Sequence, residues 1–362
     1  MAKTKGLCEI CSPKQWKTIS TDMLTDGGYP VYGANGVIGC YSEYNHEKPT
    51  LLITCRGATC GTLNICEPYS YVNGNAMALD NLTDEVDIKY LYYYLLNRGF
   101  EDVVTGSAQP QIVRQSLQKV NVTYPDKERQ AEIVTVLEKA SELIALRKKQ
   151  LAKLDQLVKS RFVELFGKRQ YPKVALIDLI KEGSGLSYGI VQPGDDGTGD
   201  MGVLRPVDMV DGKISTASIK YIDRSIGDGF KKTELTGDEL LITVRGTTGI
   251  TALTDSRFAG MNVTRGIAVI RYDRNMINPV YLNAYLNTDE SQRYIQEHTQ
   301  GATLQQINLS DLRVQEIIVP PQDRQEQMAT FVEQTDKSKL AIQQSLDKLE
   351  TLKKSLMQEY FG

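Results

Sequence analysis

The chain contains an internal repeat, and this repeat limits the possible folds more than any other feature of the sequence. Residues 51–57 (LLITCRG) return 189 positions later as residues 240–246 (LLITVRG). Near the end of each copy the spacing becomes 195 positions and then continues without a gap. A repeat of this length predicts two copies of one structural unit. We therefore expect two units in the 362 residues, covering 1–167 and 168–362.

Each copy changes in character near a proline, Pro125 or Pro320. Before the proline, short runs of Val, Ile, Thr and Tyr alternate with Gly-containing turns, which is typical of a twisted β-sheet, and short apolar stretches predict additional short helices. After the proline comes a long segment without Gly or Pro. The pattern predicts an α+β fold with two tandem globular domains, each followed by a long α-helix. The expected boundaries are 1–125, 126–167, 168–320 and 321–362.

Apolar residues follow alternating steps of three and four along both long segments, which is the spacing of a coiled-coil seam. A helix of about 38 residues is about 57 Å long and exposes an apolar stripe that must be covered. The simplest cover is an antiparallel coiled coil with a pseudo-twofold relation between the copies; alternatively, each helix folds back on its own domain. The expected seam residues are Ile133, Leu137, Ile144, Leu151, Leu154, Val158, Ile342, Leu346, Leu349 and Leu356, interrupted by Arg147, Arg161, Thr335, Lys339 and Lys353.

The lack of long apolar runs and the position of the cysteines indicate where the protein is located and whether it binds a metal. No apolar run approaches the ~18 residues that cross a bilayer, so we expect a cytoplasmic protein and no membrane partner. All six cysteines lie in the first 66 residues, and Cys8-x-x-Cys11 has the spacing of zinc ligands. The repeat, however, places Ile177 and Ile180 opposite these two cysteines. We therefore expect reduced cysteines that pack in the core, and no metal site.

The sequence does not point to an enzyme. It lacks the Asn/Asp-Pro-Pro-aromatic signature of adenine methyltransferases, and it lacks a P-loop. The two histidines, His46 and His298, occupy unmatched positions in the copies, which disfavours a histidine-based catalytic or metal site. The net charge of -3 also disfavours a protein that coats nucleic acid by bulk charge. We expect a non-catalytic chain without a cofactor of its own.

Several segments, taken in order, carry a specific resemblance. They are residues 29–36 (YPVYGANG), 56–61 (RGATCG) and 106–112 (GSAQPQI), together with the Lys-Leu-x-x-Leu-x-x-Ser endings of both long helices. With the duplication, they make the chain similar to the specificity subunit of type I restriction-modification systems. The resemblance covers essentially the whole chain and depends on the order and spacing of the motifs together.

This resemblance implies a function and a set of partners. In that family, two target recognition domains each read one half of a split site in double-stranded DNA, and the coiled coil sets the unread gap between the halves. The family scaffold binds two modification subunits, which methylate adenine with S-adenosylmethionine, and restriction subunits, which cleave DNA with ATP and Mg²⁺. All these cofactors are expected in the partner subunits. The chain itself would be the non-catalytic reader of the complex.

Candidate DNA contacts lie in turns that follow predicted strands. Arginine can read guanine or bind phosphate, and asparagine suits the edge of adenine, although the alternatives are pairing within the domain for arginine and turn chemistry for asparagine. Because Arg56 and Arg245 are matched between copies that should read different sequences, a phosphate contact or an internal role is favoured for both. In the frame of the repeat, Asn262 also falls on Asn73. The candidates are Tyr32, Asn35, Arg56, Asn73, Asn75, Lys231, Lys232, Arg245, Asn262 and Arg265.

Two other functions fit parts of the same sequence. One is a protein-only adaptor, in which the coiled coil joins two partner-binding domains and DNA plays no part. The other is a silent or exchangeable copy of a specificity subunit. A concentration of the candidate Arg, Lys and Asn residues on one side of each domain would favour the DNA reader, and scattered basic groups would favour the adaptor.

Overall fold

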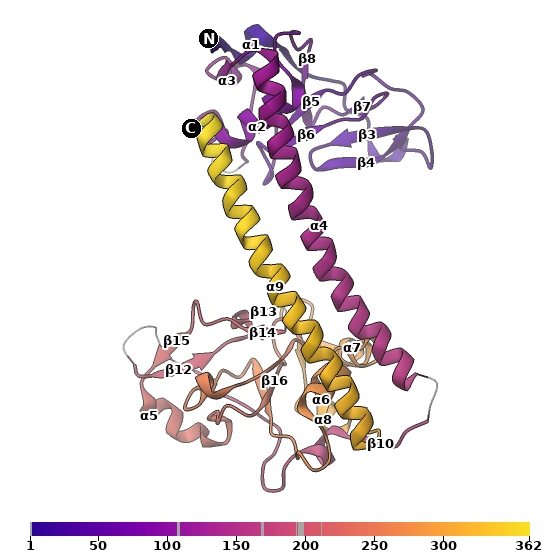
Figure 1. The fold of residues 1–362 in the computed structure, drawn as a ribbon, viewed down its shortest axis with the longest axis vertical. Helices are drawn as coiled ribbons and strands as arrows, with labels where there is room; N and C mark the ends of the chain where they lie inside the picture. The colour runs from indigo at the N-terminus through magenta and orange to yellow at the C-terminus, as the bar shows by residue number, and fades with distance from the viewer. Residues whose placement is uncertain (1, 107–108, 168–169, 193, 195–198, 211) are drawn as a thin grey trace. The chain divides into compact units, whose positions relative to one another are not determined.

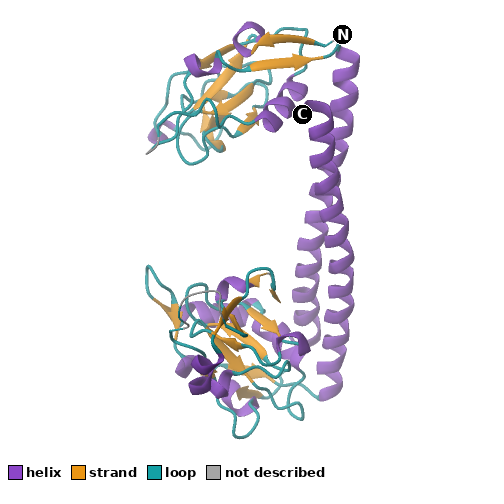
Figure 2. Cartoon of the chain, turned by 90° about the vertical axis from the view of Figure 1, so that its left-hand side faces the viewer, coloured by secondary structure: helices purple, strands orange, loops and turns teal. Residues whose placement is uncertain are grey.

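The computed structural model describes residues 2–362 except 107–108, 168–169, 193, 195–198 and 211. It forms two compact units (Figure 1): unit 1 is Met1–Lys148 with Gln344–Gly362, and unit 2 is Lys149–Gln343. Each unit therefore contains a globular part and a piece of both long helices. The division falls inside the helices, whereas the sequence repeat divides at residue 167. Figure 2 shows the strands in the globular parts and the two long helices as uninterrupted elements.

The globular part of unit 1 contains a four-stranded sheet in the order β2-β8-β5-β6, a three-stranded sheet in the order β4-β3-β7, and the pair β1-β9. The neighbours in the four-stranded sheet are antiparallel, whereas β3 and β7 run parallel. The elements are β1 (Lys3–Gly6), α1 (Leu7–Ile10), β2 (Ser12–Gln15), η1 (Thr21–Met23), β3 (Tyr29–Gly33), β4 (Gly36–Tyr41), β5 (Leu51–Thr54), β6 (Leu63–Ile65), β7 (Tyr71–Val72), β8 (Ala76–Asp80), α2 (Ile88–Arg98), α3 (Arg114–Leu117), β9 (Asn121–Tyr124) and α4 (Lys127–Phe166).

Unit 2 has the same two main sheets, ordered β11-β19-β16-β17 and β15-β12-β18, with the additional pairs β10-β22, β13-β14 and β20-β21. Its elements begin with β10 (Lys173–Ala175), η2 (Leu176–Leu179), β11 (Ser187–Tyr188), β12 (Met201–Leu204), η3 (Pro206–Asp208), β13 (Met209–Val210), β14 (Lys213–Ile214), β15 (Lys220–Ile222), α5 (Arg224–Gly227), η4 (Asp228–Thr233), β16 (Leu240–Thr243) and β17 (Thr251–Leu253). They continue with η5 (Ser256–Phe258), β18 (Asn262–Val263), β19 (Ile267–Ile270), α6 (Pro279–Leu286), α7 (Asp289–Glu297), β20 (Thr299–Gln300), β21 (Gln306–Ile307), α8 (Leu309–Val314), β22 (Glu316–Ile318) and α9 (Gln322–Phe361).

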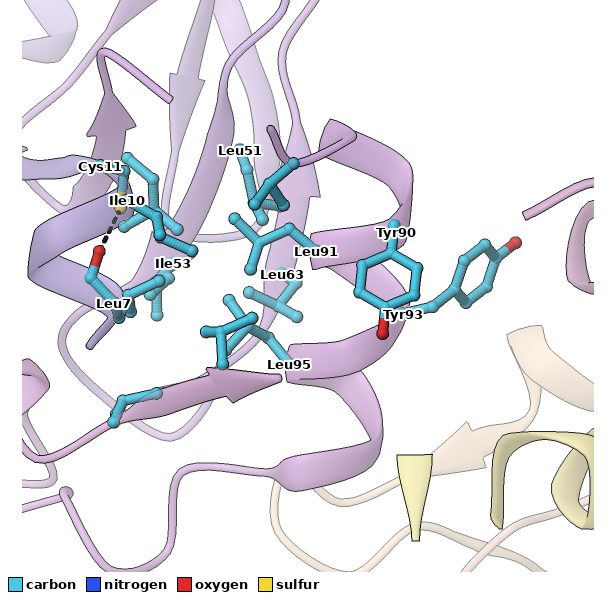
Figure 3. Close-up of a cluster of buried hydrophobic side chains, with 14 of the residues drawn as sticks. Leu7, Ile10, Cys11, Leu51, Ile53, Leu63, Tyr90, Leu91, Tyr93 and Leu95 are labelled. Atoms are coloured by element: carbon cyan, nitrogen blue, oxygen red, sulfur yellow. Dashed lines mark hydrogen bonds between the residues drawn. The ribbon is translucent and has the colours of Figure 1, made fainter. Parts of the chain in front are cut away.

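The central strand β5 is apolar on both faces because both faces are covered. Side chains alternate across a strand, so Leu51 and Ile53 pack with Leu91 of α2 on one face (Figure 3), while Leu52 packs with Val72 of β7 on the other. The matched strand β16 follows the same rule: its Leu240 and Leu241 belong to two different clusters. The repeated LLIT sequence is therefore the centre of a layered core in each unit.

The cysteines of the Cys8-x-x-Cys11 motif belong to this packed region in unit 1. Cys11 is buried beside Leu7 and Ile10, and its thiol donates a hydrogen bond to the Leu7 carbonyl oxygen at 3.1 Å (Figure 3). Burial raises the pKa of the Cys11 thiol to about 12. All six cysteines are free thiols. A buried thiol such as that of Cys11 packs as a small apolar group and is a poor nucleophile.

The two long helices, α4 and α9, each contain 40 residues, and their packing is antiparallel within each unit. In unit 1, Leu137 near the start of α4 shares a core with Met357 near the end of α9. In unit 2, Phe162 near the end of α4 shares a core with Met328 near the start of α9. This pairing, together with the mixed sheets and helices, confirms the predicted α+β fold with an antiparallel coiled coil.

The seam between the helices contains both fully buried and half-buried positions. Leu137 is 0% exposed, Ile133 5% and Leu346 5%. The other expected seam residues are half-buried, namely Ile144, Leu151, Leu154, Val158, Ile342, Leu349 and Leu356. Ion pairs flank the seam in both units, from Lys148 Nζ to Glu350 Oε1 at 2.9 Å and from Lys339 Nζ to Asp155 Oδ1 at 2.6 Å.

The strand registers correct one match that the repeat suggested. In unit 1, Tyr32 pairs with Val72, and in unit 2 the equivalent Leu204 pairs with Val263. Asn73 donates its backbone N–H to Tyr32, as Thr264 does to Leu204. Asn73 is therefore equivalent to Thr264, and Asn262 is equivalent to Tyr71. The constant offset of 189 positions fails because the second unit has two more residues between the paired strands. Thr54 of β5 pairs with Ala76 of β8, whereas the matched Thr243 of β16 pairs with Ile267 of β19.

Candidate nucleic-acid interface

The turn that follows β5 in unit 1 is held by a distant segment of the chain. Arg56 forms an isolated antiparallel β-bridge with Gln111. The Gly57 N–H donates to the Pro110 carbonyl oxygen at 3.0 Å, and the Ile112 N–H donates to the Cys55 carbonyl oxygen at 3.0 Å. Gly57 has φ +87°, a backbone conformation that is unfavourable for residues with a β-carbon. This backbone pairing fixes the turn that presents Arg56, whose side chain is exposed.

Two further turns meet the Arg56 turn. The Thr54 hydroxyl donates to the Ala34 carbonyl oxygen in the β3–β4 turn. The Cys55 N–H donates to the Asn75 carbonyl oxygen, at 3.1 Å, in the β7–β8 turn. Asn35 and Asn75 are both exposed. The carboxyl ends of β3, β5 and β7 thus bring Asn35, Arg56 and Asn75 to one edge of unit 1, which we call edge 1.

Unit 2 contains the equivalent edge. Arg245 forms a bridge with Gln306, and the Gly246 N–H donates to the Gln305 carbonyl oxygen at 2.8 Å. The Val244 N–H donates to the Gly266 carbonyl oxygen at 2.8 Å, which brings the loop containing Arg265 to the same place. Arg265 is exposed and Arg245 is half-buried. We call this set, Arg245, Arg265 and Gln306, edge 2.

Three of the predicted contacts lie inside the fold. Asn262 is 0% exposed, accepts the Thr233 hydroxyl at 2.8 Å and donates to the Phe230 carbonyl oxygen at 3.2 Å. Asn73 is 3% exposed and donates to the Ile19 carbonyl oxygen at 3.1 Å. Tyr32 is 7% exposed and packs with Leu52. Their hydrogen bonds and packing hold the loops together, so this structure gives them a structural role and does not present them to a ligand.

The lysine pair of unit 2 occupies a different place from edge 2. Lys231 and Lys232 lie on η4 and are exposed. This short helix contacts the start of β18, where its Phe230 carbonyl accepts the Asn262 amide. Arg265, by contrast, follows the other end of β18. The two lysines are therefore candidates for a contact beside edge 2 and are not part of its turn.

The structure adds Gln111 and Gln306, which the sequence analysis did not select. Both are exposed and each is the backbone partner of an edge arginine. Glutamine side chains can donate to and accept from base edges or phosphate oxygens. Gln111 and Gln306 occupy matched positions in the similar segments 106–112 and 301–307, but sequence alone could not show that these segments pair with the arginine turns. Residues 107 and 108 lie outside the described part of the chain.

The chemistry of the edges is suited to binding and offers no reaction centre. Arginine, asparagine and glutamine supply hydrogen-bond donors and acceptors but no group that titrates near neutral pH. Within the described residues, no group of three or more His, Cys, Asp or Glu side chains is placed to hold a metal ion. Nor does any helix in the described ranges have the length and apolar character needed to cross a membrane.

The duplicated domains, their turn edges and the antiparallel helices define a class of protein, and comparison with known families identifies it. Residues 1–156 and 199–353 match the model described as the type I restriction modification DNA specificity domain. The chain therefore belongs to the family of type I restriction-modification specificity subunits, whose members are non-catalytic.

Individual relatives are distant in sequence. The chain is 23% identical over 195 residues to the EcoBI specificity subunit of Escherichia coli, covering 53% of this chain and 41% of that protein. It is 29% identical over 142 residues to the EcoprrI specificity subunit of Escherichia coli, covering 38% and 35%. The matched segments thus span less than half the length of these curated relatives.

Solved structures support the fold over the full length. The type I restriction-modification S subunit from M. genitalium aligns with a TM-score of 0.61 at 15% identity, covering 100% of this chain and 96% of that chain. A structure concerned with complex assembly and conformational transition of the type I R-M system aligns with a TM-score of 0.56 at 15% identity, covering 99% and 97%. At this identity the likeness concerns the fold alone.

Proposed function

We propose that this chain reads a bipartite target in double-stranded DNA, with edge 1 contacting one half-site and edge 2 the other. The observation that carries the proposal is the repetition of one exposed edge, built on an arginine turn and a glutamine partner, in both units. Matched residues such as Arg56 and Arg245 suit contacts to phosphates, which are the same at every site. Unmatched residues, such as Asn75 and Arg265, suit base contacts that differ between half-sites.

The coiled coil sets the distance between the half-sites in this proposal. A helix of 40 residues is about 60 Å long at 1.5 Å per residue. Because α4 begins in unit 1 and ends in unit 2, its length bounds the separation of the two readers. Base pairs follow each other at about 3.4 Å, so we expect half-sites roughly one to one and a half turns of DNA apart.

The helices also offer a surface for the other subunits of the complex. Val136, Leu143 and Leu146 on α4 are 38%, 44% and 54% exposed. Exposed apolar residues gathered on one element favour a protein contact. We assign this surface to modification subunits, which would bring S-adenosylmethionine for adenine methylation, and we assign DNA cleavage with ATP and Mg²⁺ to restriction subunits. The complex would act in the cytoplasm, where the DNA lies.

Binding to duplex DNA by the assembled complex tests the reading surface. Arg56→Ala or Arg265→Ala should weaken binding by about 1–3 kcal/mol, or roughly 5- to 150-fold, because each removes a charged contact to a base or phosphate. The control is Arg257→Ala, since Arg257 is exposed but pairs with Asp255 at 2.7 Å and lies outside edge 2. Unchanged affinity in both edge variants, with intact folding, would remove the edges as DNA contacts and favour a protein-only adaptor.

A second experiment tests the spacer. Four residues, about one helical turn, are inserted at facing positions in the centres of both α4 and α9, so that the two helices grow by the same length. The unread gap should grow by about 6 Å, or one to two base pairs. A recognised gap that stays the same length would contradict the role of the helices as a ruler.

A further inference from the structure

Unit 1 carries an exposed aromatic surface that the proposed DNA-reading function does not use. Tyr29, Tyr44 and Tyr69 are 37%, 38% and 52% exposed. The rings of Tyr29 and Tyr44 lie 4.8 Å apart in an edge-to-face contact, and those of Tyr44 and Tyr69 lie 5.3 Å apart in the same kind of contact. We call these three residues the tyrosine surface. Its rings hold one another in place and remain open to a ligand.

The tyrosine surface lies at the opposite end of the three-stranded sheet from edge 1. Tyr29 is the first residue of β3, and Tyr69 precedes the parallel strand β7. Asn35 and Asn75 follow the other ends of these two strands. Four residue steps along β3 correspond to about 13 Å. The tyrosine surface is therefore a separate binding surface on the same domain.

Tyr69 adopts a backbone conformation that few side chains tolerate. Its φ is 55°, in the left-handed region, where a β-carbon is crowded by the backbone. Strand register makes Gly260 its equivalent in unit 2, because Tyr71 and Asn262 hold matched positions two residues later. Gly260 has φ +79° and takes this conformation without strain. One copy thus uses glycine at the position where the other keeps a strained and exposed tyrosine.

The strained loop is held firmly by its neighbours. The His46 and Ser70 backbones exchange two hydrogen bonds of 3.0 Å, and the Ser70 hydroxyl donates to the Glu67 carbonyl oxygen at 2.6 Å. Behind them, His46 Nε2 contacts Asp80 Oδ1 at 2.9 Å. These contacts fix the backbone next to Tyr69, and the contact with Tyr44 supports its ring. A strained residue that is held in this way and exposed to solvent is a mark of a functional surface.

The charge around the tyrosine surface is negative. Residues 42–48 and 66–70 carry Glu43, Glu47 and Glu67, all exposed, against the cation Lys48 and the buried His46. The charge of Glu47 raises the pKa of the Tyr44 hydroxyl. Phosphates would be repelled by these carboxylates. A guanidinium group, in contrast, stacks on tyrosine and pairs with carboxylates.

We propose that the tyrosine surface is a docking site for an arginine-rich segment of a protein partner. Arginine side chains stack on the exposed rings of Tyr44 and Tyr69, and Glu43, Glu47 and Glu67 neutralise their charge. Unit 2 has no such site in its described equivalent, because Gly260 replaces Tyr69 and the buried Met201 replaces Tyr29. The proposal does not depend on the DNA-reading role of the edges.

The test measures binding of the full chain to a fluorescent (Arg-Gly)₅ peptide by anisotropy at low salt. The wild-type chain should bind saturably, and a (Lys-Gly)₅ peptide should bind more weakly because its ammonium groups stack less well. Tyr69→Gly should weaken (Arg-Gly)₅ binding at least fivefold while keeping the backbone conformation. Glu43→Gln with Glu47→Gln should weaken it as well. Tyr188→Ser is the matched control, since Tyr188 is a tyrosine of unit 2 that is 51% exposed.

Two outcomes would overturn the proposal. The first is the absence of saturable (Arg-Gly)₅ binding by the wild-type chain. The second is equal peptide affinity in the wild type and in Tyr69→Gly, with circular dichroism showing that both are folded. In the second case, an additional loss of duplex DNA affinity in Tyr69→Gly would assign the surface to nucleic acid.

Discussion

The two units have the same sheets in the same order, yet they differ at the positions that face outward. The bridge between Arg56 and Gln111 recurs between Arg245 and Gln306, so this edge belongs to the common framework. The loops beside it differ, with Asn75 exposed in unit 1 and Arg265 exposed in unit 2. A shared backbone that carries different side chains is suited to binding two DNA sequences through the same phosphate geometry.

The helix seam shows a second difference between the copies. With the spacing of 195 positions, Arg147 is equivalent to Ile342, and Lys353 is equivalent to Val158. At these two positions, a cation in one copy of the repeat is replaced by an apolar residue in the other copy. Polar residues at single seam positions are known to fix register and partner choice at a cost in stability. Each helix is therefore adapted to the other and is not a copy of it.

The largest expected effect is a difference in stability loss between a buried seam position and an exposed position of α4. Leu137 is 0% exposed and lies in the core of unit 1, whereas Leu143 is 44% exposed. Leu137→Ala should reduce the free energy of unfolding by about 2–5 kcal/mol because it leaves a cavity. Leu143→Ala should change it by less than about 0.5 kcal/mol. Denaturant unfolding measures both, and similar losses would contradict the assigned packing.

The buried asparagines provide the next comparison. Asn262 accepts from Thr233 and donates to Phe230, whereas Asn73 makes one donor contact, to Ile19, and its buried Oδ1 has no hydrogen-bond partner. Asn262→Ala should therefore cost about 1–3 kcal/mol of stability, and Asn73→Ala should cost less. Thermal unfolding ranks the two variants. If either variant kept full stability and lost DNA affinity, its side chain would be a DNA contact after all.

Tyr69 and Gly260 hold the same left-handed backbone position in the two units, so substitutions there should change stability in opposite directions. A β-carbon at Gly260 meets no atom within 4 Å, so the cost of Gly260→Ala comes from the backbone alone. We expect a loss of about 1 kcal/mol, since non-glycine residues are disfavoured at positive φ. Tyr69→Gly removes the same strain in unit 1 and should be neutral or stabilising. Thermal unfolding checks both, and a clear loss of stability in Tyr69→Gly would show that the ring contributes to folding.

The smallest expected effect concerns a seam lysine and depends on pH. Burial, with a smaller contribution from Lys148, lowers the pKa of Lys353 from its ordinary 10.5. The charged form is thus disfavoured in the fold, and this penalty is constant below the lowered pKa and disappears as the pH rises past 10.5. Lys353→Met should stabilise the chain at pH 7, and this gain should shrink with rising pH. A gain that does not change between pH 7 and 10.5 would contradict the burial of the charge.

Much of the fold could be predicted from the sequence because the repeat and the heptads depend on local patterns. The long helices appear at 127–166 and 322–361, close to the Gly- and Pro-free segments, and the LLIT runs became central strands. The match predicted between Asn73 and Asn262 was wrong. Unit 2 has two more residues between its matched strands, and this insertion does not change the motifs on either side of it. Register depends on contacts across the sheet, which a single frame cannot supply.

The candidate site was harder to predict for the same reason. Arg56, Asn35 and Asn75 come from separate turns, and backbone hydrogen bonds bring them together. The burial of Tyr32 and Asn73 depends on the three-stranded sheet, whose strands β4 and β7 are far apart in the sequence. Residue type indicated chemistry that suits DNA. Only the tertiary structure could show which of these side chains reach the surface.

The most direct test of the account is sequencing of methylated adenines in cells that contain this chain and its modification partner. The account predicts one motif with two unlike short half-sites at a fixed gap. It also predicts that Arg265→Ala, which alters unit 2 alone, relaxes one half-site and leaves the other half-site and the gap unchanged. A single contiguous motif, or an Arg265→Ala variant that alters both half-sites equally, would contradict the assignment of one half-site to each unit.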